Sequence, residues 1–368
     1  MIRERRSVAV GDAGFSLIEL LISTAIMVTV TGAIFGLMTP AQNSSQSQPE
    51  VADMQQRMRV GTDTLFREVM MVGAGPYQGP VTGSLINFFA PILPRRIGDI
   101  GADPVTGAGS VKTDRIMLAY VPNTYSQTTI SAAMPPNSSD LKVNNQPNCP
   151  VGQPLCGFVT GMQVIIFDTA GHWDTFTITS VQGAAGKLQH QGQDLNYTYP
   201  AGASVTQVVT ETLYLDSTTN QLKKYNSAST EEPVIDNVVD LQFDYFGDPD
   251  PPKFPKPPAG VANCLYDAAG NYANLPTLTA NDGSLAALTA AQLGDGPYCG
   301  SGDNTFDADL LRIRKVRVSL RVQATSPSLR GSSTALFKKP GTAKGGDRYV
   351  PDYRLSFDIS PRNLNLAR

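Results

Sequence analysis

The chain has 368 residues, a formal net charge of −3 at pH 7, 41% apolar residues and 17% charged residues. This composition is typical of a folded protein with one large or two modest domains. No basic stripe with interleaved aromatic residues runs along the sequence, which argues against nucleic acid as a partner.

The N-terminal region predicts a membrane anchor. Residues 1–14 contain three arginines, and a mostly apolar stretch follows from Phe15 to Met38. At about 1.5 Å per residue a helix over this stretch is about 36 Å long, enough to cross a hydrocarbon core of roughly 30 Å. The positive charges are expected to stay in the cytoplasm. We therefore predict one transmembrane helix over 15–40.

The order of signals around Gly14 is unusual for export. In a secretory signal the small residue of the cleavage site follows the apolar region, whereas Gly14 precedes it. Cleavage after Gly14 would therefore remove the charged leader 1–14 and keep the helix. Glu19 lies inside the apolar stretch, and a charge at the bilayer centre costs about 2.5–3.5 kcal/mol even on lenient scales. Glu19 is a functional candidate, with an interfacial glutamate that reaches water as the alternative.

The segment Gly14-Phe15-Ser16-Leu17-Ile18-Glu19 resembles the processing motif of type IV prepilins and pseudopilins. In that family a membrane peptidase cuts after the glycine and methylates the new N-terminal phenylalanine, and the glutamate pairs with the N-terminal amine of a neighbouring subunit. The resemblance implies cleavage between Gly14 and Phe15, N-methylation of Phe15 and a subunit assembly role for Glu19. It implies prepilin peptidase, other major and minor pilins and the inner membrane as partners, and no cofactor.

A second helical segment is expected after the anchor. Residues 41–49 are polar and predict a loop or a frayed connection, and 41–73 is expected to be the amphipathic continuation of the pilin helix. Its apolar residues recur mostly at helical spacing and predict a buried face: Val51, Met54, Met58, Leu65, Val69 and Val72. Gly73-Ala74-Gly75-Pro76 should end this helix.

Residues 74–368 predict a β-rich globular domain. Many Gly, Pro, Thr, Val and Tyr residues favour short strands and long loops, with long loops at 121–160 and 247–308. The expected strands cover residues 115–120, 163–167, 174–180, 205–215, 221–225, 238–245, 315–324 and 353–359. In 315–322, alternation predicts a buried face and a basic, solvated or subunit-facing face. The expected fold class is α+β, with a long N-terminal helix packed on an antiparallel sheet.

The cysteines predict two disulfides. Four cysteines follow an export signal: Cys149, Cys156, Cys264 and Cys299. Three pairings are possible. Pairing Cys149 with Cys156 and Cys264 with Cys299 is favoured, because each pair brackets its own Pro/Gly/Asn-rich loop. Zinc is the alternative, but the sequence has no CxxC motif and only two histidines.

Other motifs give no catalytic or metal site. The sequence His172-Trp173-Asp174 has no GxSxG serine and predicts a surface turn, so we do not expect an enzyme. Asp303, Asp307 and Asp309 could supply oxygen ligands for calcium, but the EF-hand spacing fails. A solvated turn is the other interpretation, and we predict no metal.

The later segments resemble PilW-type minor pilins and the related J-type pseudopilins of type II secretion. The residues that carry this resemblance are DMQQRMRVGTDTLFREVMMVGAG, LYLDSTTNQLKKY, VIDNVVDLQFDY and RIRKVRVSLRV. It implies a minor pilin that primes type IV pilus assembly and sits at or near the tip. A pilus-tip adhesin and a J-type pseudopilin are the alternatives. The chain would reside in the inner membrane before assembly, and in the periplasm and the cell-surface pilus afterwards.

Overall fold

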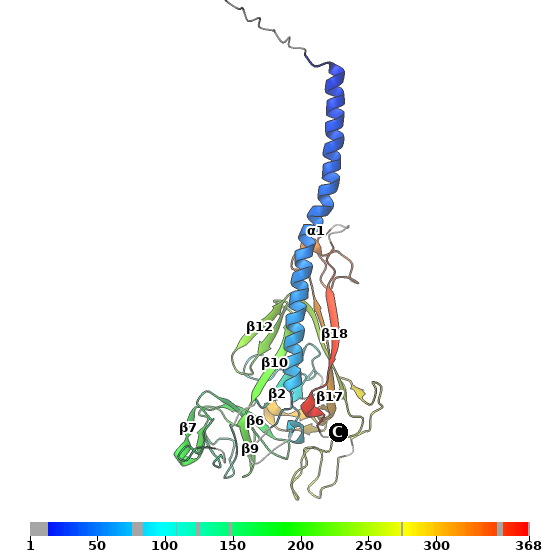
Figure 1. Cartoon of the computed structure of the whole chain (residues 1–368). Helices are drawn as coiled ribbons and strands as arrows, with labels where there is room; N and C mark the ends of the chain where they lie inside the picture. Colours follow the sequence, from blue (N-terminus) through cyan, green and yellow to red (C-terminus); the bar gives the residue numbers. More distant parts are fainter. Residues whose placement is uncertain are drawn as a thin grey trace, which may run out of the picture.

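The computed structural model describes residues 14–75, 84–107, 109–122, 126–146, 149–273, 275–343 and 349–366, with the backbone alone over 39–44. Residues 1–13 of the predicted leader lie outside these ranges. The fold is α+β, as expected: one long N-terminal helix is followed by several antiparallel sheets (Figure 1). Helix and sheets together form an elongated molecule with the body at one end of the helix.

Helix α1 runs without interruption from Leu17 to Met71, over 55 residues. The expected loop or frayed connection at 41–49 is therefore wrong. Helical turns lie on both sides of this polar segment, and extending an existing helix is easier than nucleating a new one. The helix ends just before Gly73, as predicted, and at this glycine φ is +73° and an added Cβ would lie 2.4 Å from Leu364 Cδ2. Only glycine suits this position.

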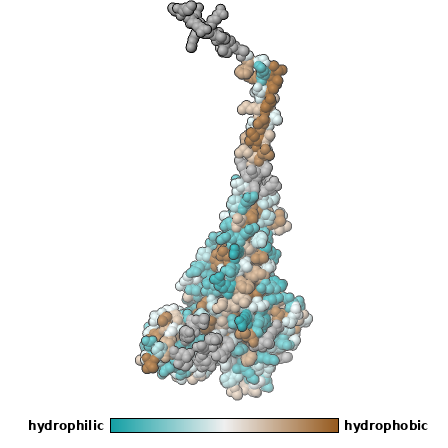
Figure 2. Space-filling view, in the orientation of Figure 1, coloured by the Kyte–Doolittle hydropathy of each residue, from teal (hydrophilic) through white to brown (hydrophobic). Residues whose placement is uncertain are grey.

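The two halves of α1 differ in their surroundings. Leu17–Met38 is long and apolar enough to cross a membrane, and its side chains are exposed in the isolated chain, as the hydrophobic colours in Figure 2 show. The second half packs on the sheets, and its buried side chains include Met54, Met58, Leu65 and Val69. Val51 was expected on this face but is 40% exposed, because the face starts one turn later.

Two antiparallel sheets form the body under the helix. The first has the strand order β1-β2-β10-β11-β12, made of Ile92–Leu93, Arg115–Tyr120, Val209–Asp216, Gln221–Tyr225 and Glu231–Asp236. The second has the order β14-β13-β17-β18, made of Ala286–Leu288, Val238–Gly247, Ile313–Val322 and Tyr353–Ile359. Helix α1 contacts β12 and β2 of the first sheet and β17 and β18 of the second. It therefore covers the junction between them.

A smaller β-rich unit, here called the distal lobe, is inserted between β2 and β10. One of its sheets has the order β3-β9-β5-β6, made of Gln127–Thr129, Ser204–Gln207, Gln163–Phe167 and Trp173–Thr177. The other has the order β4-β8-β7, made of Asp140–Lys142, Lys187–Gln189 and Ser180–Gln182. The lobe has its own hydrophobic core and lies at the end of the body away from the start of α1 (Figure 1).

Strand β5 separates the core of the distal lobe from the core of the body. Val164 and Ile166 point into the core of the lobe, whereas Ile165 and Phe167 point into the core of the body. Alternate residues of a strand face opposite sides, and here both sides are buried. This explains the continuous apolar run of the strand and holds the lobe firmly on the body.

Most expected strands are confirmed, with three corrections. The segment 205–215 is divided between β9 and β10, since Val208 interrupts the ladder. The segment 174–180 ends earlier, at Thr177 of β6. The expected long loops contain short strands: β3 and β4 lie within 121–160, and β14, β15 and β16 lie within 247–308. The remaining elements are short: β15 (Tyr298–Cys299), β16 (Phe306–Asp307) and the 3-10 helices Leu85–Asn87, Gly183–Ala185, Gly302–Asn304, Ala308–Arg312, Pro327–Leu329 and Arg362–Leu364.

Candidate functional site

The predicted cleavage site lies just before helix α1, and the rest of the motif forms the first turn of the helix. Ser16 is the N-cap residue with an extended backbone (φ −72°, ψ 147°), so Gly14 and Phe15 precede the helix. Phe15 is 90% exposed, and a Cβ added at Gly14 would meet nothing within 4 Å. The peptide bond between Gly14 and Phe15 is therefore accessible in the isolated chain, outside hydrogen-bonded helix.

Glu19 closes a capping box with Ser16. The Glu19 carboxylate accepts a hydrogen bond from Ser16 N–H at 2.9 Å, and Ser16 Oγ accepts one from Glu19 N–H at 3.2 Å. Both bonds give a partner to backbone N–H groups that have no hydrogen-bond acceptor within the first helical turn. The negative charge is also favourable at a helix N-terminus. This contact was not predicted, although Ser-x-x-Glu ahead of an apolar run is a readable signal for it.

Both predicted disulfides are present. Cys149 bonds to Cys156 within the distal lobe, with 5.5 Å between the Cα atoms. Cys264 bonds to Cys299 with a Cα separation of 5.0 Å and closes a loop within the 247–308 segment, with Cys299 in the core of the body. The described part of the chain has no free cysteine. Disulfides persist in oxidising compartments, which indicates an extracytoplasmic body.

Comparison with protein-family models, with curated proteins and with solved structures finds no match. The chain consists of an N-terminal apolar helix followed by a β-rich, disulfide-bonded domain.

The carboxylates considered for calcium are only partly brought together. Among the described residues, one group of three carboxylates has oxygen atoms within 4.8 Å of one another, and it consists of Asp295, Asp307 and Asp309. Asp303 is exposed and stands outside this group. Burial raises the pKa of Asp307 to about 6.

Asp307 and Asp309 already have partners within the protein. Asp307 accepts hydrogen bonds from the N–H groups of Asp309, at 2.8 Å, and Gly296, at 2.6 Å. Asp309 pairs with Arg312, which is fully buried and also donates to the carbonyls of Pro249 and Pro276. Through these contacts Asp307 and Asp309 anchor the 247–308 segment.

His172 belongs to a turn, as predicted, but Trp173 and Asp174 of the same motif are buried residues of β6, so the expected surface turn is wrong for them. His172 lies between β5 and β6, its Nδ1 is 3.0 Å from Asp168 Oδ2, and its ring stacks on Tyr197 with 3.3 Å between centroids. Asp168 also accepts the backbone N–H groups of Ala170 and His172. The aspartate thus closes the turn and orients the imidazole. Asp174, the last residue of the motif, accepts hydrogen bonds from Asn196, Tyr199 and Asn304.

The basic face of β17 is paired with aspartates. Arg317 Nε lies 2.7 Å from Asp358 Oδ1, and Lys315 Nζ lies 3.2 Å from Asp358 Oδ2. Arg321 Nε lies 2.9 Å from Asp352 Oδ2. The opposite face carries the buried residues that alternation predicted: Val316, Val318, Leu320 and Val322. The positive row is thus neutralised on the protein surface.

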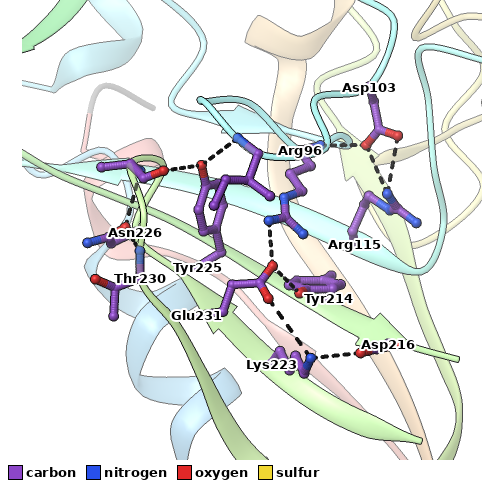
Figure 3. Close-up of polar contacts among 12 residues, drawn as sticks. Arg96, Asp103, Arg115, Tyr214, Asp216, Lys223, Tyr225, Asn226, Thr230 and Glu231 are labelled. Atoms are coloured by element: carbon purple, nitrogen blue, oxygen red, sulfur yellow. Dashed lines mark hydrogen bonds and ion pairs between the residues drawn. The ribbon is translucent and has the colours of Figure 1, made fainter. Parts of the chain in front are cut away.

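A polar network that was not predicted joins the loop after β1 to the first sheet (Figure 3). Arg96 Nη2 lies 2.6 Å from Glu231 Oε1, and its guanidinium sits over the rings of Tyr214 and Tyr225, at 4.7 and 4.1 Å. Hydrogen bonds from Tyr214 and Arg96 lower the pKa of Glu231. Because Arg96 and Glu231 are far apart in sequence, no local pattern indicates the pair.

Proposed function

We propose that this chain is a type IV prepilin-like protein that is cleaved and built into a pilus as a minor pilin. The observation that carries the proposal is the first half of α1. It is an exposed apolar helix that begins directly after an accessible Gly14-Phe15 bond and has Glu19 in its first turn. An exposed apolar surface of this size requires lipid or neighbouring helices.

The proposal gives each half of the helix a role. Before assembly, Leu17–Met38 holds the protein in the inner membrane and the body faces the periplasm, where its disulfides are stable. After cleavage by prepilin peptidase, the same surface packs against the helices of other major and minor pilins. The role is structural, and the described histidine and aspartate groups serve turns and anchors, which supports this reading.

We further propose that the protein lies at or near the filament tip. The distal lobe lies at the end of the body away from the anchor (Figure 1), so it adds bulk where a filament subunit would face outward. The same observation favours a second candidate function, a pilus-tip adhesin. Removing the loop 149–156 should abolish attachment and spare piliation if the chain is an adhesin.

The experiment is recovery of the protein in sheared surface filaments. We expect the native chain in the filament fraction and the variant Gly14→Val, uncleaved, in the membrane fraction. A side chain at Gly14 meets open space, so this variant changes peptidase recognition without disturbing the fold. Recovery of the native chain only from membranes would contradict the proposal. If recovery in filaments requires a type II secretion machine and not a pilus machine, the result would favour the J-type pseudopilin.

A further inference from the structure

Strand β18 is a long free edge of the second sheet. Its seven residues, Tyr353–Ile359, pair with β17 on one side, and no other described strand pairs with the outer side. Leu355 and Phe357 face the core of the body, and the alternate residues are polar and exposed. A free edge presents a row of backbone N–H and C=O groups to which a further strand can bind.

The other edges of the two body sheets are short or interrupted. Strand β1 has two residues and β14 has three. Strand β12 has six residues, but it contains Pro233, and its register with β11 shifts between Leu222 and Lys223. Short strands, prolines and bulges are the usual protection of a sheet edge against further pairing. Strand β18 has no proline and pairs with β17 without a shift, so its edge stays open.

A groove of about 690 Å³ runs between this edge and helix α1. Helix α1 lines it between Gln55 and Phe66, and β18 lines it with Tyr353 and Leu355. Phe66 is 47% exposed and Tyr353 is 46% exposed. This stretch of α1 is about 17 Å long at about 1.5 Å per residue, which matches about five strand residues at roughly 3.3 Å each. The groove therefore has the length and the apolar side chains to hold one extended segment.

The unpaired charges beside this edge are positive. Arg354 is exposed, makes no ion pair or hydrogen bond with the described residues, and lies next to Arg321 of β17, which has its own aspartate partner. Like charges opposite each other on neighbouring strands are destabilising. Arg59 in the groove is also exposed and unpaired within the described chain, whereas Asp63 and Asp358 already have cationic partners. A segment that fills the groove is therefore expected to carry a carboxylate.

We propose that the edge of β18 binds an extended segment of another protein as an antiparallel strand. The segment has apolar side chains at every second position, toward α1, and a carboxylate opposite Arg354. Main-chain hydrogen bonds give such a complex affinity, and the alternate side chains give it specificity. A second copy of this chain is disfavoured, because β18 runs alongside α1 (Figure 1) and twofold antiparallel pairing would point the two apolar helices in opposite directions. The inference does not rest on pilus assembly.

The test measures the binding of two fluorescent peptides to the full chain in detergent micelles, with empty micelles as background. The acidic probe is Tyr-Thr-Leu-Ser-Phe-Asp-Ile, and the basic probe has lysine in place of aspartate. When the serine of an antiparallel probe lies opposite Ser356, its sixth residue lies opposite Arg354. The variant Arg354→Glu reverses the charge at this position. Arg362→Glu is the matched control, since Arg362 is exposed and lies outside the groove.

We expect the acidic probe to bind the native chain about fivefold more tightly than the basic probe, the effect of exchanging an attractive cross-strand pair for a repulsive one. Arg354→Glu should reverse this preference, and Arg362→Glu should keep it. Unchanged thermal unfolding of both variants will show that the fold is intact. No binding above that of empty micelles, equal binding of the two probes, or an unreversed preference would overturn the proposal. A homodimer in native mass spectrometry that Arg354→Glu dissociates would show a second copy at the edge and would also overturn it.

Discussion

Ser16 N–H donates a hydrogen bond to the Glu19 carboxylate over 2.9 Å, and Glu19 N–H donates one back to Ser16 Oγ. In the single chain this capping box gives the carboxylate a local partner at the start of the apolar helix. If Glu19 pairs with the amine of a neighbour's Phe15 in a filament, the local bond must be exchanged for the ion pair. Two substitutions separate these roles.

Glu19→Gln should block assembly and leave the anchor intact. Glutamine also forms capping boxes, so the helix start is preserved, and membrane insertion becomes easier without the charge. The neighbour's amine would then lack its carboxylate, and breaking a buried ion pair costs about 3–5 kcal/mol. The measurement is the amount of processed protein in sheared filaments and in membranes.

Ser16→Ala is the matched control for Glu19→Gln. It removes the hydroxyl of the cap, at a cost of about 1 kcal/mol, but keeps the carboxylate. We expect this variant to enter filaments. If Glu19→Gln assembles normally, the ion-pair role is wrong, and the carboxylate serves only the capping box, which glutamine preserves.

The two disulfides should contribute unequally to stability. Cys264 and Cys299 are 35 residues apart, whereas Cys149 and Cys156 are 7 apart. The chain-entropy relation gives about 4 kcal/mol for the longer loop and about 2 kcal/mol for the shorter one. Chemical denaturation of the paired serine variants should show this order. The reverse order, or reactive thiols in the native protein, would contradict the account.

Asp307 should make stability depend on pH. Burial raises its pKa to about 6 in the folded protein, above the ordinary value of 3.8. The folded state therefore binds this proton more tightly, and the contribution is present below pH 4 and lost as pH rises through about 6. The groups that face Asp307 include the carboxylates of Asp295 and Asp309.

The variant Asp307→Asn tests this dependence. It keeps an acceptor for Asp309 N–H but cannot ionise, so it should gain stability relative to the native chain as pH rises from 4 to 7. The measurement is the difference in thermal midpoint between the two proteins at each pH. A constant difference would show that Asp307 does not titrate in this window.

The sequence predicted the elements that local periodicity determines. Met54, Met58, Leu65 and Val69 repeat with the helical period, and their burial on the sheets follows from it. Alternation in β17 placed Val316, Val318, Leu320 and Val322 in the core in the same way. The disulfide pairing was also predicted, because each pair closes a single local loop.

Features that depend on distant contacts were not predicted. The run 163–167 suggested a buried strand, but only the structure shows that its two faces serve two different cores. Strand β12 was missed, since Pro233 disfavours a strand except at a sheet edge, where β12 lies. The Arg96–Glu231 pair and the Asp174–Asn304 contact join segments more than 100 residues apart.

The most direct test of the central claim is the N-terminus of the mature protein. Mass spectrometry of filament-associated protein should find a chain that begins at Phe15 and carries one added methyl group. The accessible bond before α1 and the retained helix Leu17–Met38 both lead to this result. An intact leader, or a chain that begins beyond Met38, would contradict the proposal that this protein is a processed pilin.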